Sequence, residues 1–270
     1  MKITQPFSLD YQVHSFRSHD GRASIREHCL GAVALGLTEI GFSEHKDTDP
    51  EDKYTAYFDD TLYSQEIEAA QNEFSGQLVI RKGIEIDYQK WFEKDIPAFL
   101  NVHQFDYVMG TVHFLDRVVI MSKEYNEGKT REEAYRGYFT AVLDSVKSGL
   151  FDFVGHLEYC NRWGIAAWGA YSPEPFRDIL TEIFTEMIAR EMTLEFNTGG
   201  LHRGIGVTLP GLETMRLYHE LGGRRMTFGS DAHHPDQLAH EFEWAITHLK
   251  EIGEWQFVSF EDRKPILRPL

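Results

Sequence analysis

The sequence is poor in cysteine and in basic residues. Its 270 residues include two cysteines, Cys29 and Cys160, and neither lies in a CxxC motif. Two thiols so far apart in sequence favour buried, free cysteines in a reducing compartment. Lysine and arginine number 27 against 43 aspartate and glutamate residues, which gives a formal net charge of −16. So acidic a chain argues against nucleic acid or an anionic membrane surface as the main partner.

Long apolar runs are also missing. No stretch approaches the roughly 20 apolar residues that span a membrane. The start, MKITQPFSLDY, lacks the apolar core of a secretory signal, so we expect a cytoplasmic protein. No low-complexity tract, linker or repeat suggests a division, and we expect one domain over residues 1–270.

Several common catalytic signatures are absent. There is no GxGxxG motif for a dinucleotide and no GxSxG motif for a serine hydrolase. Gly128-Lys129-Thr130 resembles the end of a phosphate-binding P-loop, but Lys123 stands where that motif requires glycine.

Short apolar, β-branched or aromatic runs alternate with segments of helical period. This alternation predicts an α/β protein built as a single β/α barrel. We expect strands at 7–14, 38–42, 78–86, 105–112, 151–154, 192–196 and 225–228. We expect helices at 23–35, 60–74, 131–147, 173–188 and 238–249, with a closing segment at 255–260.

Most of the expected strands end in a side chain that can bind a metal ion. These residues are His14, His45, Glu85, His113, His156, Asp231 and His233. In β/α barrels the active site lies at the C-terminal ends of the strands, where such residues would meet. Gln12 would share a face with His14, because alternate residues of a strand point the same way, and Asp20 can join from the following loop.

The donor types indicate the kind of metal. Imidazoles and carboxylates without thiolates favour zinc, manganese or iron, and the set is too large for one ion, so we expect two or three divalent ions. Each residue alone has an ordinary alternative. A single histidine is more often a structural hydrogen-bonding residue, and Glu85 could instead pair with a buried lysine or arginine.

Two arginines follow expected strands in loops on the same side. Arg162 comes after His156, and Arg203 comes after Asn197 in a glycine-rich stretch. Arginine binds phosphate oxygens through two parallel donors, although either residue alone could be an ordinary surface or salt-bridge residue.

Taken in order, the motifs resemble those of the polymerase-and-histidinol-phosphatase (PHP) superfamily of metal-dependent phosphoesterases. The matching stretches are DYQVHSFRSHDG, GFSEH, GIEIDY, GTVHF, GHLEY, EFNTGG and GSDAH. The stretches LEFNTGGLHRGIG, GHLEYCNRWG and FEDRKPI look most like the histidinol-phosphatase branch. The resemblance implies a distorted (β/α)7 barrel with up to three metal ions.

The resemblance also implies three ligand sets. The first is His14, Glu85 and Asp231; the second is Glu85, His113 and His156; the third is Asp20, His45 and His233. The family usually has H-x-H in its first motif, and Gln12 stands here in place of the first histidine. We include Gln12 among the expected metal ligands, as a neutral oxygen donor.

The implied reaction is hydrolysis of L-histidinol phosphate to L-histidinol and phosphate in histidine biosynthesis. The resemblance implies that Arg162 and Arg203 hold the phosphate, and we expect His202 to contact the substrate. His233, Asp231 or a metal-bound water could supply a proton to the leaving group. The expected partner is a small phosphorylated substrate, and the oligomeric state stays open. The alternatives are another small phosphoester, such as a nucleotide or sugar phosphate, or a metal-binding barrel that has lost activity.

Overall fold

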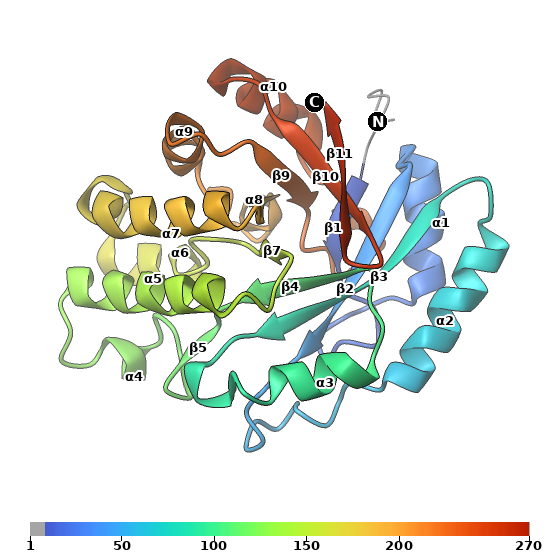
Figure 1. The fold of residues 1–270 in the computed structure, drawn as a ribbon, viewed down its shortest axis with the longest axis horizontal. Helices are drawn as coiled ribbons and strands as arrows, with labels where there is room; N and C mark the ends of the chain where they lie inside the picture. The colour runs from blue at the N-terminus through green and yellow to red at the C-terminus, as the bar shows by residue number, and fades with distance from the viewer. Residues whose placement is uncertain (1–8, 270) are drawn as a thin grey trace.

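Seven parallel strands form the centre of the molecule. The computed structural model describes residues 9–269 (Figure 1). The strands, in spatial as well as chain order, are β1 (Leu9–Val13), β2 (Glu39–Lys46), β3 (Val79–Asp87), β4 (Tyr107–Thr111), β7 (Phe153–Val154), β8 (Thr193–Asn197) and β9 (Arg225–Gly229).

The first and last of these strands also meet. The amide of His14 donates to the Ala232 carbonyl at 2.8 Å, and the Ala232 amide donates to the Gln12 carbonyl at 3.2 Å. A parallel bridge joins Val13 to Ala232. These bonds join β1 to β9, the first and last of the seven parallel strands, and the predicted distorted (β/α)7 barrel is confirmed.

Helices cover the outside of the barrel (Figure 1). The longer ones are α1 (Ile25–Leu35), α2 (Asp60–Glu73), α3 (Ile96–Val102), α5 (Arg131–Ser148), α6 (Asn161–Trp168), α7 (Arg177–Ala189), α9 (Leu212–Glu220) and α10 (Phe242–Ile252). Shorter elements are β5 (Phe114–Leu115), β6 (Val118–Val119), α4 (Lys123–Asn126), α8 (Gly199–His202) and the 3₁₀ turns η1 (Lys90–Phe92), η2 (Glu174–Phe176) and η3 (Pro235–Gln237). No helix in this part of the chain is both long and apolar enough to cross a membrane.

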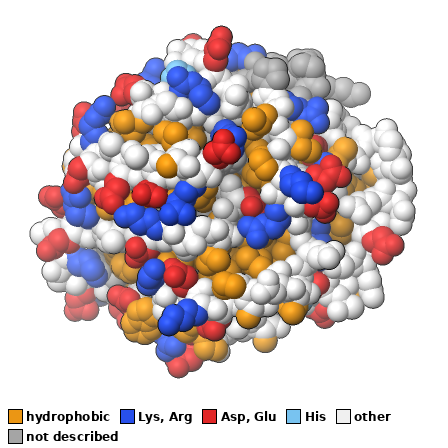
Figure 2. Space-filling model, in the orientation of Figure 1, with side chains coloured by type: hydrophobic (Ala, Val, Ile, Leu, Met, Phe, Trp, Pro, Cys, Tyr) orange, Lys and Arg blue, Asp and Glu red, His pale blue; other side chains and the backbone are white. Residues whose placement is uncertain are grey.

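Local signals start and stop several helices. The capping box predicted for Thr130 and Glu133 is present at the start of α5, and an equivalent pair, Ser24 and Glu27, opens α1. Gly149 ends α5 with φ at 69°, in the left-handed region where glycine carries no steric penalty. On the face shown in Figure 2, acidic and basic side chains are interspersed rather than gathered. Ion pairs such as Arg136–Asp178 join α5 to α7.

A hairpin closes the N-terminal end of the barrel. β10 (Gln256–Glu261) runs parallel to the start of β9 and turns back as β11 (Lys264–Pro269). The ring of Phe260 packs against Tyr11, Tyr107 and Phe153, with centroids 5.6–6.2 Å apart. Sequence analysis predicted β10 as a closing segment but missed β11. The opposite, C-terminal end of the barrel remains available for a site.

Three predicted boundaries were wrong. β2 continues beyond residue 42, so His45 lies within a strand rather than after one. The helix expected from residue 173 is preceded by the 3₁₀ turn η2, and α7 begins only at Arg177. The helix expected from residue 238 begins at Phe242, because Ala239 and Glu241 adopt positive φ angles that no α-helix contains.

Candidate metal centre

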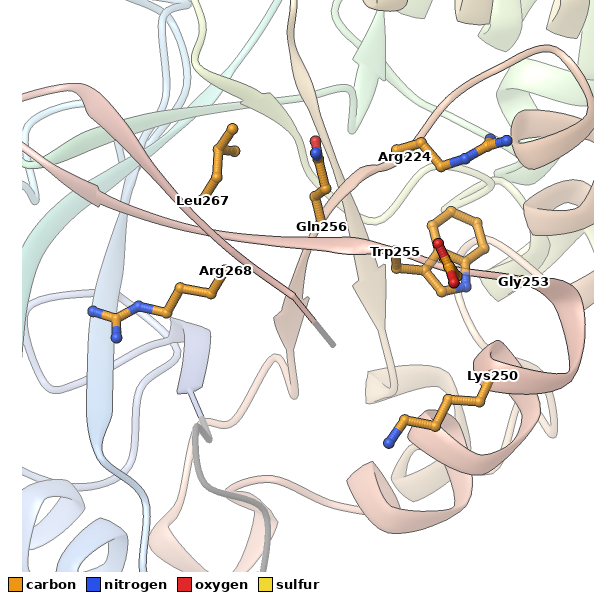
Figure 3. A pocket seen from close by; sticks show the side chains of 8 residues that line it. Arg224, Lys250, Gly253, Trp255, Gln256, Leu267 and Arg268 are labelled. Atoms are coloured by element: carbon orange, nitrogen blue, oxygen red, sulfur yellow. The ribbon is translucent and has the colours of Figure 1, made fainter.

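The predicted donors converge at the C-terminal end of the barrel. A cavity of about 440 Å³ opens there, and His14 lies beneath it, fully buried. Predicted donors in the cavity wall are Asp20, His45, Glu85, His113, His156, Asp231 and His233. A larger hollow of about 860 Å³ lies beside β10 and β11, lined by Arg224, Lys250 and Trp255 among others (Figure 3). It contains none of the predicted ligands, so chemistry rather than size locates the site.

The tightest group of donors is built on Glu85. Its Oε1 lies 3.2 Å from His156 Nε2 and 3.3 Å from His113 Nε2, and those two nitrogens are 3.2 Å apart. Ligand atoms about 2.0–2.1 Å from a tetrahedral zinc ion are about 3.3–3.4 Å from one another. The spacing of the three atoms therefore fits a shared cation, and this group is the second of the predicted sets.

The other oxygen of Glu85 belongs to a second group. His14 Nε2 lies 3.3 Å from Glu85 Oε2 and 3.4 Å from Asp231 Oδ1. This nitrogen is buried and has no hydrogen-bond partner among the described residues. A buried polar atom without a partner is costly, and a cation between these three atoms would satisfy it.

A third group lies nearest the cavity mouth. The two oxygens of Asp20 lie 3.5 Å from His45 Nε2 and 3.1 Å from His233 Nε2. One nitrogen each from His14, His45 and His233 also lie within 4.8 Å of one another. The rings of His14 and His45 stack at 4.4 Å, so the first and third groups adjoin.

A buried network sets the tautomer of His14. Ser18 Oγ donates its only hydrogen to Glu44 Oε2 at 2.5 Å, because a carboxylate can only accept. Ser18 Oγ also accepts a hydrogen bond from the His45 amide at 3.0 Å and lies 3.2 Å from His14 Nδ1. Nδ1 must therefore carry the hydrogen, which leaves the Nε2 lone pair free for a metal ion.

Asp87 contacts His113 much as Ser18 contacts His14. Its amide donates to Asp87 Oδ1 at 2.6 Å, and its Nδ1 lies 3.5 Å from the same oxygen. Burial raises the pKa of Asp87 to about 8. Burial also lowers the pKa of His113 to about 3, so its imidazole is neutral at pH 7, as a metal ligand must be.

The carboxylates of the centre are held in their anionic forms. Burial alone would raise the pKa of Glu85, but His45, His14 and His156 lower it well below its ordinary value. Burial likewise opposes ionisation of Asp231, yet the Arg203 guanidinium and the imidazoles of His14 and His233 lower its pKa strongly. Both residues thus keep negative oxygens directed at the donor nitrogens.

Both predicted arginines line the cavity, but His202 does not. Arg203 Nη2 pairs with Asp231 Oδ2 at 2.8 Å, and Arg162 Nη1 donates to the Tyr159 hydroxyl at 2.6 Å. His202 lies 2.8 Å from the Ser230 carbonyl through Nε2, outside the cavity wall. A substrate contact by His202 stays a prediction.

Gln12 lies under the centre and is completely buried. Its Nε2 donates to Glu85 Oε2 at 2.8 Å, and its Oε1 accepts a hydrogen bond from Asn197. Sequence reasoning missed Asn197 as a partner of Gln12, and it missed Glu195, which accepts from the His156 amide at 2.6 Å. The i, i+2 spacing of Glu195 and Asn197 was the available signal, since it places both on the inner face of β8.

The cavity rim includes part of the loop between β2 and α2. The rings of His19 and Tyr54 stack with centroids 3.8 Å apart. Asp47, Asp52 and Lys53 line the cavity beside them. The rim therefore offers aromatic surface and carboxylates near a metal-type centre.

Comparisons with known proteins agree with this geometry. A model of the PHP domain matches residues 10–199. The histidinol-phosphatase of Lactococcus lactis is 32% identical over 262 residues, which is 95% of both chains. A probable histidinol-phosphatase of Deinococcus radiodurans is 28% identical and covers 94% of this chain and 97% of its own.

Solved structures resemble the whole chain. The crystal structure of the Lactococcus lactis histidinol phosphate phosphatase, complexed with zinc, L-histidinol and phosphate, has a TM-score of 0.87 at 30% identity and covers 96% of this chain and 98% of its own. A crystal structure from Listeria monocytogenes has a TM-score of 0.78 at 24% identity, covers 88% and 99%, and supports the fold alone.

The match to the PHP domain and the site together define a metal-dependent phosphoesterase. The chain belongs to the PHP family and, within it, to the histidinol-phosphatase type. The family and the branch expected from the motifs are thereby confirmed.

Proposed function

We propose that the protein hydrolyses L-histidinol phosphate to L-histidinol and phosphate, as a step of histidine biosynthesis. The observation that carries the proposal is the meeting of three donor groups and two arginines in one cavity. The Lactococcus lactis relative, 30% identical in the structural match, holds zinc, L-histidinol and phosphate. A cavity with metal-type donors and guanidinium groups suits a small phosphomonoester.

The proposed cofactor is a set of two or three divalent ions, with zinc the first choice and manganese or iron as alternatives. The donor spacings support His14, Glu85 and Asp231 as one set. They likewise support Glu85 with His113 and His156, and Asp20 with His45 and His233. Bound divalent ions would lower the pKa of coordinated water and supply a hydroxide nucleophile.

The chain's own residues would bind and neutralise the phosphate. Arg162 and Arg203 can each present two parallel N–H donors to phosphate oxygens, on which negative charge is held during phosphoryl transfer. Arg203 pairs with Asp231 in the structure, so binding a phosphate would give it a second anionic partner. Asp231 is held in its anionic form, so the proposed proton source for the leaving alkoxide is His233, whose Nδ1 lies 3.1 Å from Arg203 Nη2, or a metal-bound water.

The residues of the cavity rim suit a substrate whose leaving group carries positive charge. Asp47 and Asp52 both line the cavity. Histidinol carries an amine and an imidazole, which would be attracted to such carboxylates and could lie against the His19–Tyr54 stack.

Phosphate release from L-histidinol phosphate tests the proposal. The purified protein would be assayed as isolated, with added zinc or manganese, and after chelation, alongside nucleotide and sugar phosphates. We expect metal-dependent turnover with kcat/KM highest for L-histidinol phosphate. Preference for another phosphomonoester would replace the substrate, and bound metal without turnover on any phosphoester would indicate a barrel that has lost activity.

A further inference from the structure

Gln12 occupies a place beside the metal-type centre where a ligand was expected. We propose that Gln12 binds no metal ion and is instead a positioning residue, which orients Glu85 through a chain of hydrogen bonds that begins at a backbone amide. The inference rests on the metal centre of the proposed function and is independent of the substrate.

The chain of hydrogen bonds begins at Gly199. Its backbone N–H donates to Asn197 Oδ1 at 2.7 Å. A backbone N–H can only donate, so the Asn197 atom that faces it must be the carbonyl oxygen. The Asn197 NH2 group then faces the opposite way, where it donates to Gln12 Oε1 and, at 3.3 Å, to Glu195 Oε2.

The orientation of the Gln12 amide follows from that of Asn197. Because an NH2 group faces it from Asn197, the near atom of Gln12 must be the acceptor Oε1. Its other end, Nε2, donates to Glu85 Oε2 at 2.8 Å. Turning the Gln12 amide over would bring two NH2 groups together at one end and two oxygens together at the other. All three side chains are buried, so water could not relieve either mismatch.

This orientation takes Gln12 out of the ligand set. The only amide atom that binds a metal ion is the oxygen, and that atom is committed to Asn197. The NH2 group facing Glu85 has no lone pair to offer. An ion beside His14, Glu85 and Asp231 would therefore have these three protein ligands and an open position for water or substrate.

The hydrogen bond from Gln12 Nε2 also fixes which donor group each oxygen of Glu85 faces. Oε2 accepts from Gln12 and faces His14, while Oε1 faces His113 and His156. A rotation of this carboxylate would disturb both donor groups at once. Partners that hold a ligating carboxylate in this way commonly change metal affinity by about 10–100-fold when removed.

A substitution that adds a negative charge separates the two possible roles of Gln12, metal ligand and positioning residue. In Gln12→Glu, a metal-ligating oxygen would become an anion and zinc would bind as tightly or more tightly. A positioning residue would instead set a second carboxylate against Glu85, and we expect zinc affinity to fall about tenfold or more. Affinity would be measured by competition with a chromogenic chelator on the full chain. The control is Gln71→Glu, since Gln71 bonds the distant Ile80 carbonyl and should leave zinc affinity unchanged.

A second pair of variants keeps the test valid if Gln12→Glu folds poorly. Asn197→Asp would replace the NH2 group that holds Gln12 and should weaken zinc binding about tenfold. In a Gln12→Met background its effect should be smaller, because only the 3.3 Å contact of Asn197 with Glu195 then remains. Thermal unfolding of the metal-free proteins verifies that each is folded.

Several results would overturn the proposal. They are equal or tighter zinc binding by Gln12→Glu, additive losses in the double variant, and a zinc-bound crystal structure with Gln12 Oε1 about 2.1 Å from the ion. A wild-type protein that binds no zinc would remove the centre and this role with it. A wild type that binds zinc but releases no phosphate from L-histidinol phosphate would overturn only the proposed substrate.

Discussion

The two ends of the barrel treat buried polar groups in opposite ways. At the N-terminal end, the buried Glu39 pairs with Arg81 at 2.8 Å, and the exposed Arg263 covers Asp152 by bonding both of its oxygens. The ring of Phe260 fills the space between the strands, and its amide donates to the Tyr11 hydroxyl at 3.0 Å. The protein itself satisfies these groups.

At the C-terminal end, imidazoles and carboxylates face one another without cationic side chains to match most of them. His14 Nε2 is buried without a hydrogen-bond partner in the described part of the chain. One ligand atom each of Glu85, His113 and His156 lie within 4.8 Å of one another. One end therefore stabilises the fold, while the other is arranged for an external cation. If this comparison holds, substitutions at the C-terminal end of the barrel should alter metal binding, and substitutions at the N-terminal end should alter only the free energy of unfolding.

The largest functional effect is expected from Glu85→Ala. Glu85 faces both His14 and the His113–His156 pair, so its loss would disrupt two donor groups. We expect a fall in activity greater than the roughly 100-fold that loss of an outer partner causes. Elemental analysis should show at least one ion fewer per chain. Full metal content in this variant would contradict the ligand assignment.

The largest effect on stability is expected from Phe260→Ala at the opposite end. The ring is buried between Tyr11, Tyr107 and Phe153, so truncation leaves a cavity. We expect the free energy of unfolding to fall by about 3–5 kcal/mol. Denaturant unfolding measures this value. Metal content and KM at low temperature should match those of the wild type, and a change in either would weaken the contrast between the two ends.

Arg162→Ala should affect substrate rather than metal. Arg162 lines the cavity and bonds Tyr159, but it contacts none of the donor groups. We expect KM for L-histidinol phosphate to rise by about 10-fold or more, the effect of losing a charge-assisted contact worth about 1.5–3 kcal/mol. Steady-state kinetics with metal analysis would measure both quantities. Unchanged kinetics would remove Arg162 from the phosphate site.

A smaller effect is expected from Ser18→Ala. Without the hydroxyl, His14 Nδ1 loses its acceptor and the imidazole tautomer is no longer set. Zinc affinity should fall about tenfold, while Ser18→Thr should restore most of it because the hydroxyl returns. Chelator competition measures both variants. Failure of threonine to rescue would indicate that packing, rather than the tautomer, is the role of Ser18.

Zinc affinity should also depend on pH. Burial lowers the pKa of His14, but the Asp231 and Glu85 carboxylates together raise it well above its usual 6.5 and so favour the protonated imidazole in the metal-free protein. Zinc must displace this proton, and affinity should rise about tenfold per pH unit for each proton released. Calorimetric titration in buffers of different protonation enthalpy measures that number. His113 should contribute no proton, since its pKa lies near 3.

The sequence alone determined the architecture and brought most of the candidate metal ligands to one end of it. Apolar strands followed by His14, Glu85, His113, His156 and Asp231 predicted a barrel whose strand ends meet, and they do meet. This success has a physical reason. The strand period and the parallel β/α order place every C-terminal strand end at one face, whatever the details of packing.

Only the tertiary structure decided which groups touch. The orientation of Gln12 depends on Asn197, 185 residues away in sequence, and on Glu85, 73 residues away. The Ser18 hydroxyl that orients His14 is likewise directed by Glu44 on a neighbouring strand. Hydrogen-bond polarity depends on which donor stands opposite, and no local pattern in a sequence records the partner. The sequence therefore determined where the site lies, and the packed barrel decided which atom each side chain presents to it.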